Sequence, residues 1–490
     1  MRLQFGPFLV ITALLSAPVA WSQAGSSDST QTGSSSSSQT GGSDSSQTGT
    51  SSSSSQTGLS GPSQTGPAES SPQPASEGPQ PVFTHPESKP QLALLDEVTQ
   101  HNYINLGLGL TTAYDSNAAA FSYYPYNQTM FIASPSVQLR QTHPTFTWYL
   151  GAYGGLTTST IPGYYNTSNP SANAGFLWQI NHHWQLNVND SYMYSFDPFQ
   201  QYITLTSPPT YNQPNPTIYV PLTTTEANYG NMDLTYQITA HDSVTFTGTE
   251  NFRRYLHNSY SAYNLYSWGG VGFYQHLFSP RLSAGTGYSF TSLDFGHGTS
   301  RSGISMIQAF INYQLGPHMS ISGWVGPEYT STKNLVPVFC TPYGCFIEVA
   351  HNSSWSEAFG ANFSWQGARN AAVAGFYKSI SDGGILLGVV QLWEFNGNFV
   401  RQMSPRWSFN VGALYGNNTG YSTLVHLRHL NSFTGNVSLT RQITPAWSGI
   451  LEYLRYWETQ KNIIGAAAPK WTDNRIQFTL QYYWGHSLGR

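Results

Sequence analysis

The sequence predicts an all-β fold, a closed antiparallel up-and-down transmembrane β-barrel of about 18 strands that follows a disordered N-terminal arm. From Asn102 to Arg490, long segments alternate between apolar and polar residues, as strands between two different environments do. Very short turns alternate with mostly longer connections rich in Asn, Ser, Pro and Tyr. Only 9% of residues are charged, against roughly 25% in ordinary globular proteins, while 15% are aromatic. A wall that is apolar outside and neutral-polar inside accounts for the alternation within the segments and for the composition.

The N-terminus, residues 1–24, has the pattern of a secretory signal peptide. Arg2 supplies a positive start, residues 5–15 form a short apolar run, and Ser22-Gln23-Ala24 offers a small-x-small cleavage site. The apolar run is too short to span a bilayer, which disfavours a membrane anchor. We therefore expect the mature chain to begin near Gly25 in an exported compartment.

Two compositionally biased segments precede the barrel. Residues 25–66 repeat Gln-Thr-Gly between runs of serine and offer almost no apolar surface, so we expect them to be disordered. A stacked solenoid is disfavoured because no repeat has a hydrophobic face. Residues 67–101 are expected to form a Pro-rich linker, stiffened toward polyproline II. The barrel domain then covers residues 102–490.

Period-two alternation predicts the strands. In 475–486, for example, Ile476, Phe478 and Leu480 oppose polar residues on the other face. The segment 447–460 places Glu452 among aromatics and sorts poorly, so its register stays open. The predicted strands cover 103–113, 129–142, 146–158, 171–182, 184–197, 224–239, 242–256, 264–278, 281–294, 301–315, 319–331, 355–367, 370–382, 387–403, 407–418, 433–442, 447–460 and 475–486.

The connections predict an orientation. Short turns follow every second strand, whereas the longer connections 114–128, 159–170, 198–223, 332–354, 419–432 and 461–474 follow the others. Barrels of the outer membrane have short periplasmic turns, long external loops and both termini in the periplasm. Trp184, Trp407 and Trp447 open strands directly after short turns, which favours an inner aromatic girdle over the packing of a soluble core.

Other architectures fit less well. A helical membrane protein is excluded because no run of about 18 apolar residues follows the signal. A soluble β-sandwich or propeller stays possible, but its strands usually have about five or six residues, fewer than those predicted.

The two cysteines, Cys340 and Cys345, flank a short Pro- and Gly-containing turn. An exported chain meets an oxidising compartment, so we expect a local disulfide there. A metal site is disfavoured because His351 is the one further ligand close in sequence.

The C-terminal strand resembles the insertion signal of Gram-negative outer-membrane β-barrels. The polar Gln477 precedes the late aromatics Tyr482 and Trp484, although Thr479 stands where that pattern has glycine and residues 485–490 extend past its end. Residues 113–117 are similar to the first hairpin of barrels associated with exopolysaccharide systems. The resemblance covers about residues 102–490, indicates no single family, and implies contact with outer-membrane lipids, lipopolysaccharide and the assembly machinery.

The sequence contains no recognisable catalytic, cofactor or metal motif, so we expect a protein that is not an enzyme and has no cofactor. A net charge of −4 without a basic cluster disfavours nucleic acid. Arg140, Asp233, Arg253 and Glu394 fall on polar strand faces. We expect these charges in the lumen, where they either set ion selectivity or form structural pairs. The Pro- and Tyr-rich connection 198–223 either folds inward as a constriction or stands outward.

Two functional hypotheses follow. The first is a porin-like channel for passive passage of polar solutes, either neutral ones or carbohydrates, because the expected lumen is rich in Asn, Gln, Ser, Thr and Tyr. The second is an envelope or surface component that binds or guides exported polysaccharide, with residues 25–90 tethering a periplasmic partner.

Overall fold

The computed structural model describes residues 102–117, 127–160, 167–195, 217, 224–256, 264–296, 298–341, 344–383, 388–420, 429–461 and 470–487. The chain divides into the units Met1–Gly58 and Leu59–Arg490, and every described residue belongs to the second. The secretory signal, the low-complexity segment and the linker predicted within residues 1–101 lie outside the described residues and stay predictions.

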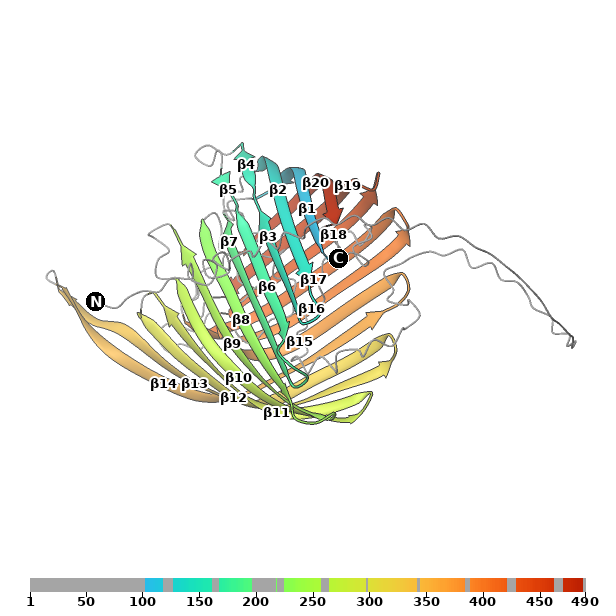
Figure 1. The fold of residues 1–490 in the computed structure, drawn as a ribbon. Coiled ribbons are helices and arrows are strands. Elements are labelled where there is room, and N and C mark those ends of the chain that lie inside the picture. Colours follow the sequence, from blue (N-terminus) through green and yellow to red (C-terminus); the bar gives the residue numbers. More distant parts are fainter. Residues whose placement is uncertain are drawn as a thin grey trace, which may run out of the picture. The chain divides into compact units, whose positions relative to one another are not determined.

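One closed antiparallel sheet forms the fold (Figure 1). β1 (Tyr103–Asp115) pairs with β2 (Gln128–Thr142) on one side and with the last strand, β20 (Lys470–Ser487), on the other, which closes the barrel. β3 (Phe146–Tyr153) and β4 (Leu156–Ser159) both pair with β2 and are one strand interrupted by two glycines. The other strands are β5 (Thr167–Ser168), β6 (Ser171–Gln179), β7 (Trp184–Ser195), β8 (Thr225–Gln237), β9 (Asp242–Tyr255), β10 (Leu265–Ser279), β11 (Leu282–Phe295), β12 (Ser300–Gly316), β13 (Met319–Thr341), β14 (Gly344–Gln366), β15 (Asn370–Asp382), β16 (Val389–Ser404), β17 (Trp407–Gly420), β18 (His429–Gln442) and β19 (Trp447–Lys461).

The strand number agrees with the prediction. β5 pairs with β4 as β6 pairs with β3, so these four elements are two interrupted strands, and 20 − 2 = 18 strands make up the wall. The predicted fold class and the predicted number of strands are therefore confirmed. The short turns gather at one end of the barrel, here called the short-turn end, and the other connections at the long-connection end.

The outer face is apolar. Large side chains that point outward stay strongly exposed, such as Phe131 (57%), Ile307 (59%) and Val325 (56%). On β20 the predicted alternation is present, with Ile476 and Phe478 exposed on the outer face. Exposed apolar groups of this size and number belong in a lipid environment rather than in water. In the described part of the chain, no helix is long and apolar enough to cross a membrane.

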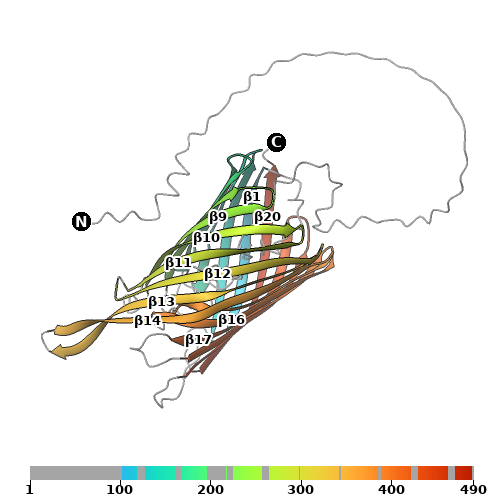
Figure 2. The same ribbon diagram turned by 90° about the horizontal axis from the view of Figure 1, so that it is seen from below.

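One predicted connection is wrong. The segment 332–354 belongs mostly to β13 and β14, which have 23 residues each and project beyond their neighbours (Figures 1 and 2). Pro337 lies in this segment, and proline lacks a ladder N–H. The pair accommodates it with a register shift between Pro337 and Phe339, and the adjacent Leu, Val and Phe residues favour strand.

The wall divides between β14 and β15 at the long-connection end. Their pairing stops at Phe359 and Lys378, whereas β15 stays paired with β16 as far as Asp382 and Val389. The β13–β14 hairpin continues past the wall, and the end of β15–β16 turns into the lumen. Residues 380–383 and 388–392 at this end are called the inner tip below.

Candidate functional site

The inner tip packs as a second layer against the inside of the wall. Ile380 and Val389 of the tip are 6% and 3% exposed and form one apolar cluster with Leu265, Leu293, Phe295 and Ile304 of β10, β11 and β12. These wall residues lie on strand faces opposite to the lipid-facing ones, as the exposure of their neighbours shows. An apolar patch inside the lumen is thus covered by an apolar hairpin end, which excludes water from both.

Polar contacts fix the inner tip at two points. Arg253 Nη2 of β9 lies 2.6 Å from Asp382 Oδ1, and both side chains are buried. Ile380 N–H, at the place where β15 has left β14, donates to Glu328 Oε2 at 3.0 Å. A strand that loses its neighbour leaves backbone N–H groups without an acceptor in the sheet. The Glu328 carboxylate is the acceptor for one of these groups, that of Ile380. The tip is therefore attached to both β9 and β13.

A second inward contact comes from the segment 198–223. Thr217, its one described residue, is 1% exposed and accepts a hydrogen bond of 2.8 Å from Asn418 Nδ2 on the inner face of β17. A side chain at Gly416 would collide with Thr217, so glycine permits this close approach. Thr217 therefore reaches the inner wall 201 positions away in sequence. The sequence left open whether the segment 198–223 folds inward or stands outward, and Thr217 lies inward. The other residues of this segment lie outside the described residues.

A polar network surrounds Asp233 on the opposite part of the wall. Thr247 Oγ1 donates to Asp233 Oδ1 at 2.7 Å, and the amides of Asn187 and Asn231 each donate to Oδ2 at 3.2 Å. Asn189 extends the network, because its amide donates to Asn187 Oδ1 at 3.2 Å. All of these donors are neutral, and these side chains are half-exposed to the lumen. The network offers amides and hydroxyls to a solute.

Asparagine side chains line other parts of the inner wall by lying over glycines on neighbouring strands. A Cβ added at Gly151 would collide with Asn173 Oδ1, and a Cβ added at Gly412 would collide with Asn436 Oδ1. Asn173 therefore lies over Gly151, and Asn436 lies over Gly412. A larger residue opposite either asparagine would push the amide into the lumen. Glycine thus keeps the polar lining close to the wall and leaves cross-section free.

The four predicted lumen charges all face inward, in different surroundings. Arg140 is exposed near the short-turn end, and Asp233 is half-exposed. Arg253 is paired with Asp382, and Glu394 is 1% exposed and accepts a 2.8 Å hydrogen bond from Asn396. The structure does not bring the four together, and their role stays a prediction.

Sequence reasoning missed a charged group at the seam of β1 and β20. Arg475 Nη2 lies 2.8 Å from Asp115 Oδ2, and Asp473 Oδ1 accepts from Asn117 N–H at 3.2 Å. All three charged side chains are inward and at most 3% exposed. The predicted strand ends at 113 and 475 placed Asp115 and Asp473 in connections. Extending each predicted strand by two residues, one outward and one inward, would have placed Asp115 and Asp473 in the lumen.

One further lumen carboxylate, Glu452, lies on β19, the strand whose register the sequence left open. Leu451 and Tyr453 are exposed on the lipid side, so Glu452 points inward, where Gln477 Nε2 donates to it at 2.6 Å. Gln477, predicted as part of an insertion signal, therefore lines the lumen, while Tyr482 and Trp484 of that signal face outward. Their role in insertion stays a prediction.

The three predicted girdle residues lie on the outer face at the short-turn end. The rings of Trp184 and Tyr236 are tilted against each other with centroids 4.5 Å apart, and those of Trp447 and Tyr482 have centroids 4.9 Å apart. Trp407 holds the Arg441 guanidinium 5.2 Å from its ring centroid. Their placement fits an interfacial belt, which stays a prediction.

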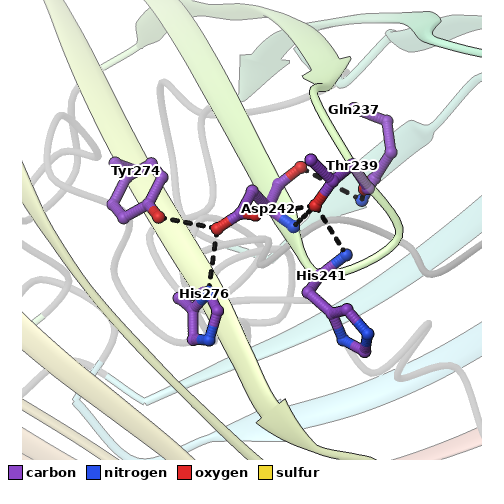
Figure 3. Close-up of polar contacts among 6 residues, drawn as sticks. All are labelled: Gln237, Thr239, His241, Asp242, Tyr274 and His276. Carbon is purple, nitrogen blue, oxygen red and sulfur yellow. Dashed lines mark hydrogen bonds and ion pairs between the residues drawn. The ribbon is translucent and has the colours of Figure 1, made fainter.

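An exposed polar cluster adjoins this belt at the turn before β9. Asp242 accepts hydrogen bonds from His276 (2.8 Å), Tyr274 (2.6 Å) and Thr239 (2.6 Å). Figure 3 shows the carboxylate between these side chains, with the His241 ring directed away. Asp242 lies at the aqueous turn, and hydrogen bonds, first from His276 and then from Thr239 and Tyr274, hold its pKa well below the usual range.

Two further findings concern metals and the cysteines. In the described ranges, no three His, Cys, Asp or Glu side chains are placed to share a metal ion. Cys340 and Cys345 are cross-strand partners in the register of β13 and β14. Their side chains lie outside the described residues, so the disulfide stays a prediction.

No protein-family model matches the chain, and a search of curated proteins finds no match. Among solved structures, the chain is similar to OccAB2 of Acinetobacter baumannii, with 10% identity, a TM-score of 0.40 and coverage of 78% of this chain and 98% of that one. OpdL of Pseudomonas aeruginosa gives 12% identity, a TM-score of 0.39 and coverage of 78% and 99%. The outer membrane protein opdK of Pseudomonas aeruginosa gives 9% identity, a TM-score of 0.38 and coverage of 78% of this chain and 99% of that one. At these identities the likeness concerns barrel architecture alone.

Proposed function

We propose that this chain is a passive channel of the bacterial outer membrane for small polar solutes, chiefly uncharged and hydroxyl-rich ones such as carbohydrates. The network around Asp233 carries the proposal. It presents amides and hydroxyls on a half-exposed inner wall, and its one carboxylate is held by neutral donors. Hydroxyl groups of a solute exchange hydrogen bonds with such a lining without needing a counter-ion.

The outer face and the turns support the location. An apolar outer band on a closed barrel fits a bilayer, and short turns at one end are typical of the periplasmic side. The inner tip and Thr217 then lie toward the exterior, where they narrow the entrance. The half-exposed side chains around Asp233 lie beyond this narrow part, closer to the periplasm.

Liposome swelling tests the proposal. Vesicles containing the folded barrel should swell in isotonic sugars, fastest with the smallest, and planar bilayers should show single-channel current. Folded protein that gives neither swelling nor current would remove the channel hypothesis and leave that of a polysaccharide guide.

A variant of the lumen tests the solute class. Asn189→Leu replaces an amide of the network by an apolar group and should slow sugar entry more than potassium current. Val188→Leu on the lipid face of the same strand is the matched control and should change neither. Equal loss of sugar entry and current in Asn189→Leu would indicate simple obstruction.

A further inference from the structure

The turns at the short-turn end are basic. Eight described turns lie at this end, and they connect β2 to β3, β6 to β7, β8 to β9, β10 to β11, β12 to β13, β14 to β15, β16 to β17 and β18 to β19. Three of the eight contain an exposed arginine: Arg281 between β10 and β11, Arg369 between β14 and β15, and Arg406 between β16 and β17. Asp242, the first residue of β9, is the one acid that directly adjoins these described turns. The turn after β18 has neither an acid nor a base. Three arginines and one aspartate give a formal charge of 3 − 1 = +2 in a chain whose net charge is −4.

Histidines occupy the four remaining turns, and all five are exposed: His143, His182, His183, His241 and His318. An exposed imidazole N–H can donate a hydrogen bond to a phosphate oxygen. Seven of the eight turns therefore carry a base, since three have arginine and four have histidine.

The surroundings of the histidines contain little negative charge. His183 Nδ1 lies 2.8 Å from the Gln237 carbonyl oxygen, and the His143 ring stacks on Phe146 at 4.4 Å. The His241 ring lies 6.5 Å from that of His276. Asp242, the nearby acid, is already occupied by His276 as Figure 3 shows. Its carboxylate contacts His276, Tyr274 and Thr239 rather than an arginine of a turn.

The basic turns adjoin the outward aromatic residues. Arg441 points outward beside the turns and stacks on Trp407, with 5.2 Å between the guanidinium carbon and the ring centroid. Trp447, 38% exposed, opens its strand directly after a turn on the same outer face. Aromatic residues of this kind lie at the headgroup level of a bilayer. The arginines and histidines therefore lie where lipid phosphates would be.

We propose that the short-turn rim binds anionic phospholipid headgroups of the leaflet on its side. The proposal rests on the membrane location given under the proposed function but not on channel activity. Guanidinium groups fit phosphate well because their donors form a planar fork. The ring of turns places several such groups around one end of the barrel.

Lipid binding to the full chain in detergent tests the rim. Phosphatidylglycerol and phosphatidylcholine with identical acyl chains are titrated, and bound lipids are counted by native mass spectrometry at pH 7.5. The wild type should prefer phosphatidylglycerol. The triple variant R281Q/R369Q/R406Q should lose at least about tenfold in phosphatidylglycerol affinity at pH 7.5, since each base near an anionic surface contributes substantially.

A matched control removes three positive charges at the other end. R254Q/R301Q/K333Q, all exposed outward residues toward the long-connection end, should change phosphatidylglycerol affinity by less than about twofold, because surface charges beyond a Debye length are screened. Heat-modifiable gel migration verifies that both variants fold. Equal losses in the two variants, or no preference for phosphatidylglycerol in the wild type, would overturn the proposal. Sugar swelling is recorded separately, so a failed channel and a failed lipid site give different results.

Discussion

The two ends of the lumen are built from different interactions. Near the short-turn end, Asp233 and its neighbours are half-exposed and held by neutral amides and hydroxyls. Toward the long-connection end, inward residues such as Phe295 and Glu394 are 1% exposed, and the inner tip covers part of the wall. The first region is wetted and offers polar groups, whereas the second is packed like a protein core.

This difference separates two tasks. A packed layer with a buried ion pair has one preferred arrangement and can set how wide the entrance is. A half-exposed lining tolerates exchange of hydrogen bonds between wall, water and solute. Perturbing the packed region should thus change stability and conductance together, while perturbing the wetted region should change selectivity with little cost in stability.

The largest effect is expected from Asp382→Asn. The change removes the carboxylate 2.6 Å from buried Arg253, and losing one partner of a buried pair costs about 3–5 kcal/mol. Denaturant unfolding should show this loss, and single-channel conductance should rise because the inner tip is no longer held against β9.

The exposed pair Arg301–Asp294, at 2.9 Å, is the matched control. Arg301→Gln should cost less than about 1 kcal/mol because exposed ion pairs contribute little. If Asp382→Asn is as mild as this control, the tip does not depend on the ion pair, and the contrast between the two ends is weaker than described.

The apolar side of the inner tip gives the next effect. Phe295→Ala removes a ring that is 1% exposed and packs in the tip cluster, so we expect a loss of about 3–5 kcal/mol. Phe246→Ala, a lipid-facing position that is 56% exposed, is the control and should cost much less. Similar losses at both positions would mean that the cluster is not packed like a core.

The barrel itself could be predicted because alternation and turns are local signals. Residues such as Phe478 and Gln477 alternate within one strand, and that alternation alone assigns them to the outer and inner faces. The same reasoning placed Arg140 and Asp233 on the lumen side. It misjudged segment 332–354 as a connection, although a register shift at Pro337 lets β13 and β14 continue as paired strands.

The inner tip could not be predicted, because it depends on contacts far apart in sequence. The connection after β15 is short, which gave no reason to expect it inside the lumen. Asp382 meets Arg253 across 129 positions, and Ile380 meets Glu328 across 52. One signal was available: Ile380, Val389 and Val390 add apolar residues on both faces of a hairpin end that should be polar if it stood in water.

A smaller effect is expected from Asp233→Asn in the wetted region. The asparagine keeps the size but removes the charge, and it accepts only part of the three hydrogen bonds, so stability should fall by about 1 kcal/mol. The reversal potential in a potassium chloride gradient should move toward anions, because a lumen carboxylate favours cations. Asp294→Asn on the outer face should leave it unchanged, and a similar shift in both would exclude a lumen effect.

The smallest effect is expected at the exposed cluster of Asp242. Hydrogen bonds from His276, Thr239 and Tyr274 lower the pKa of this carboxyl group, so it stabilises the fold above the ordinary carboxyl pKa of about 4. That contribution is lost progressively as pH falls toward the lowered folded pKa, because the unfolded chain takes up the proton first. Asp242→Asn should therefore make the acid-side decline in unfolding free energy shallower, with a small change at pH 7.

High salt connects this last prediction to the contrast between the two ends. At an ionic strength of 1 M the Debye length is about 3 Å, so the exposed Asp242 cluster should lose most of its charge-dependent contribution. The buried Arg253–Asp382 pair is shielded from the solvent and should lose little. Unfolding of the two single variants at low and high salt measures this directly. Equal salt sensitivity would show that water reaches the inner tip, and the packed end would then have to be regarded as wetted too.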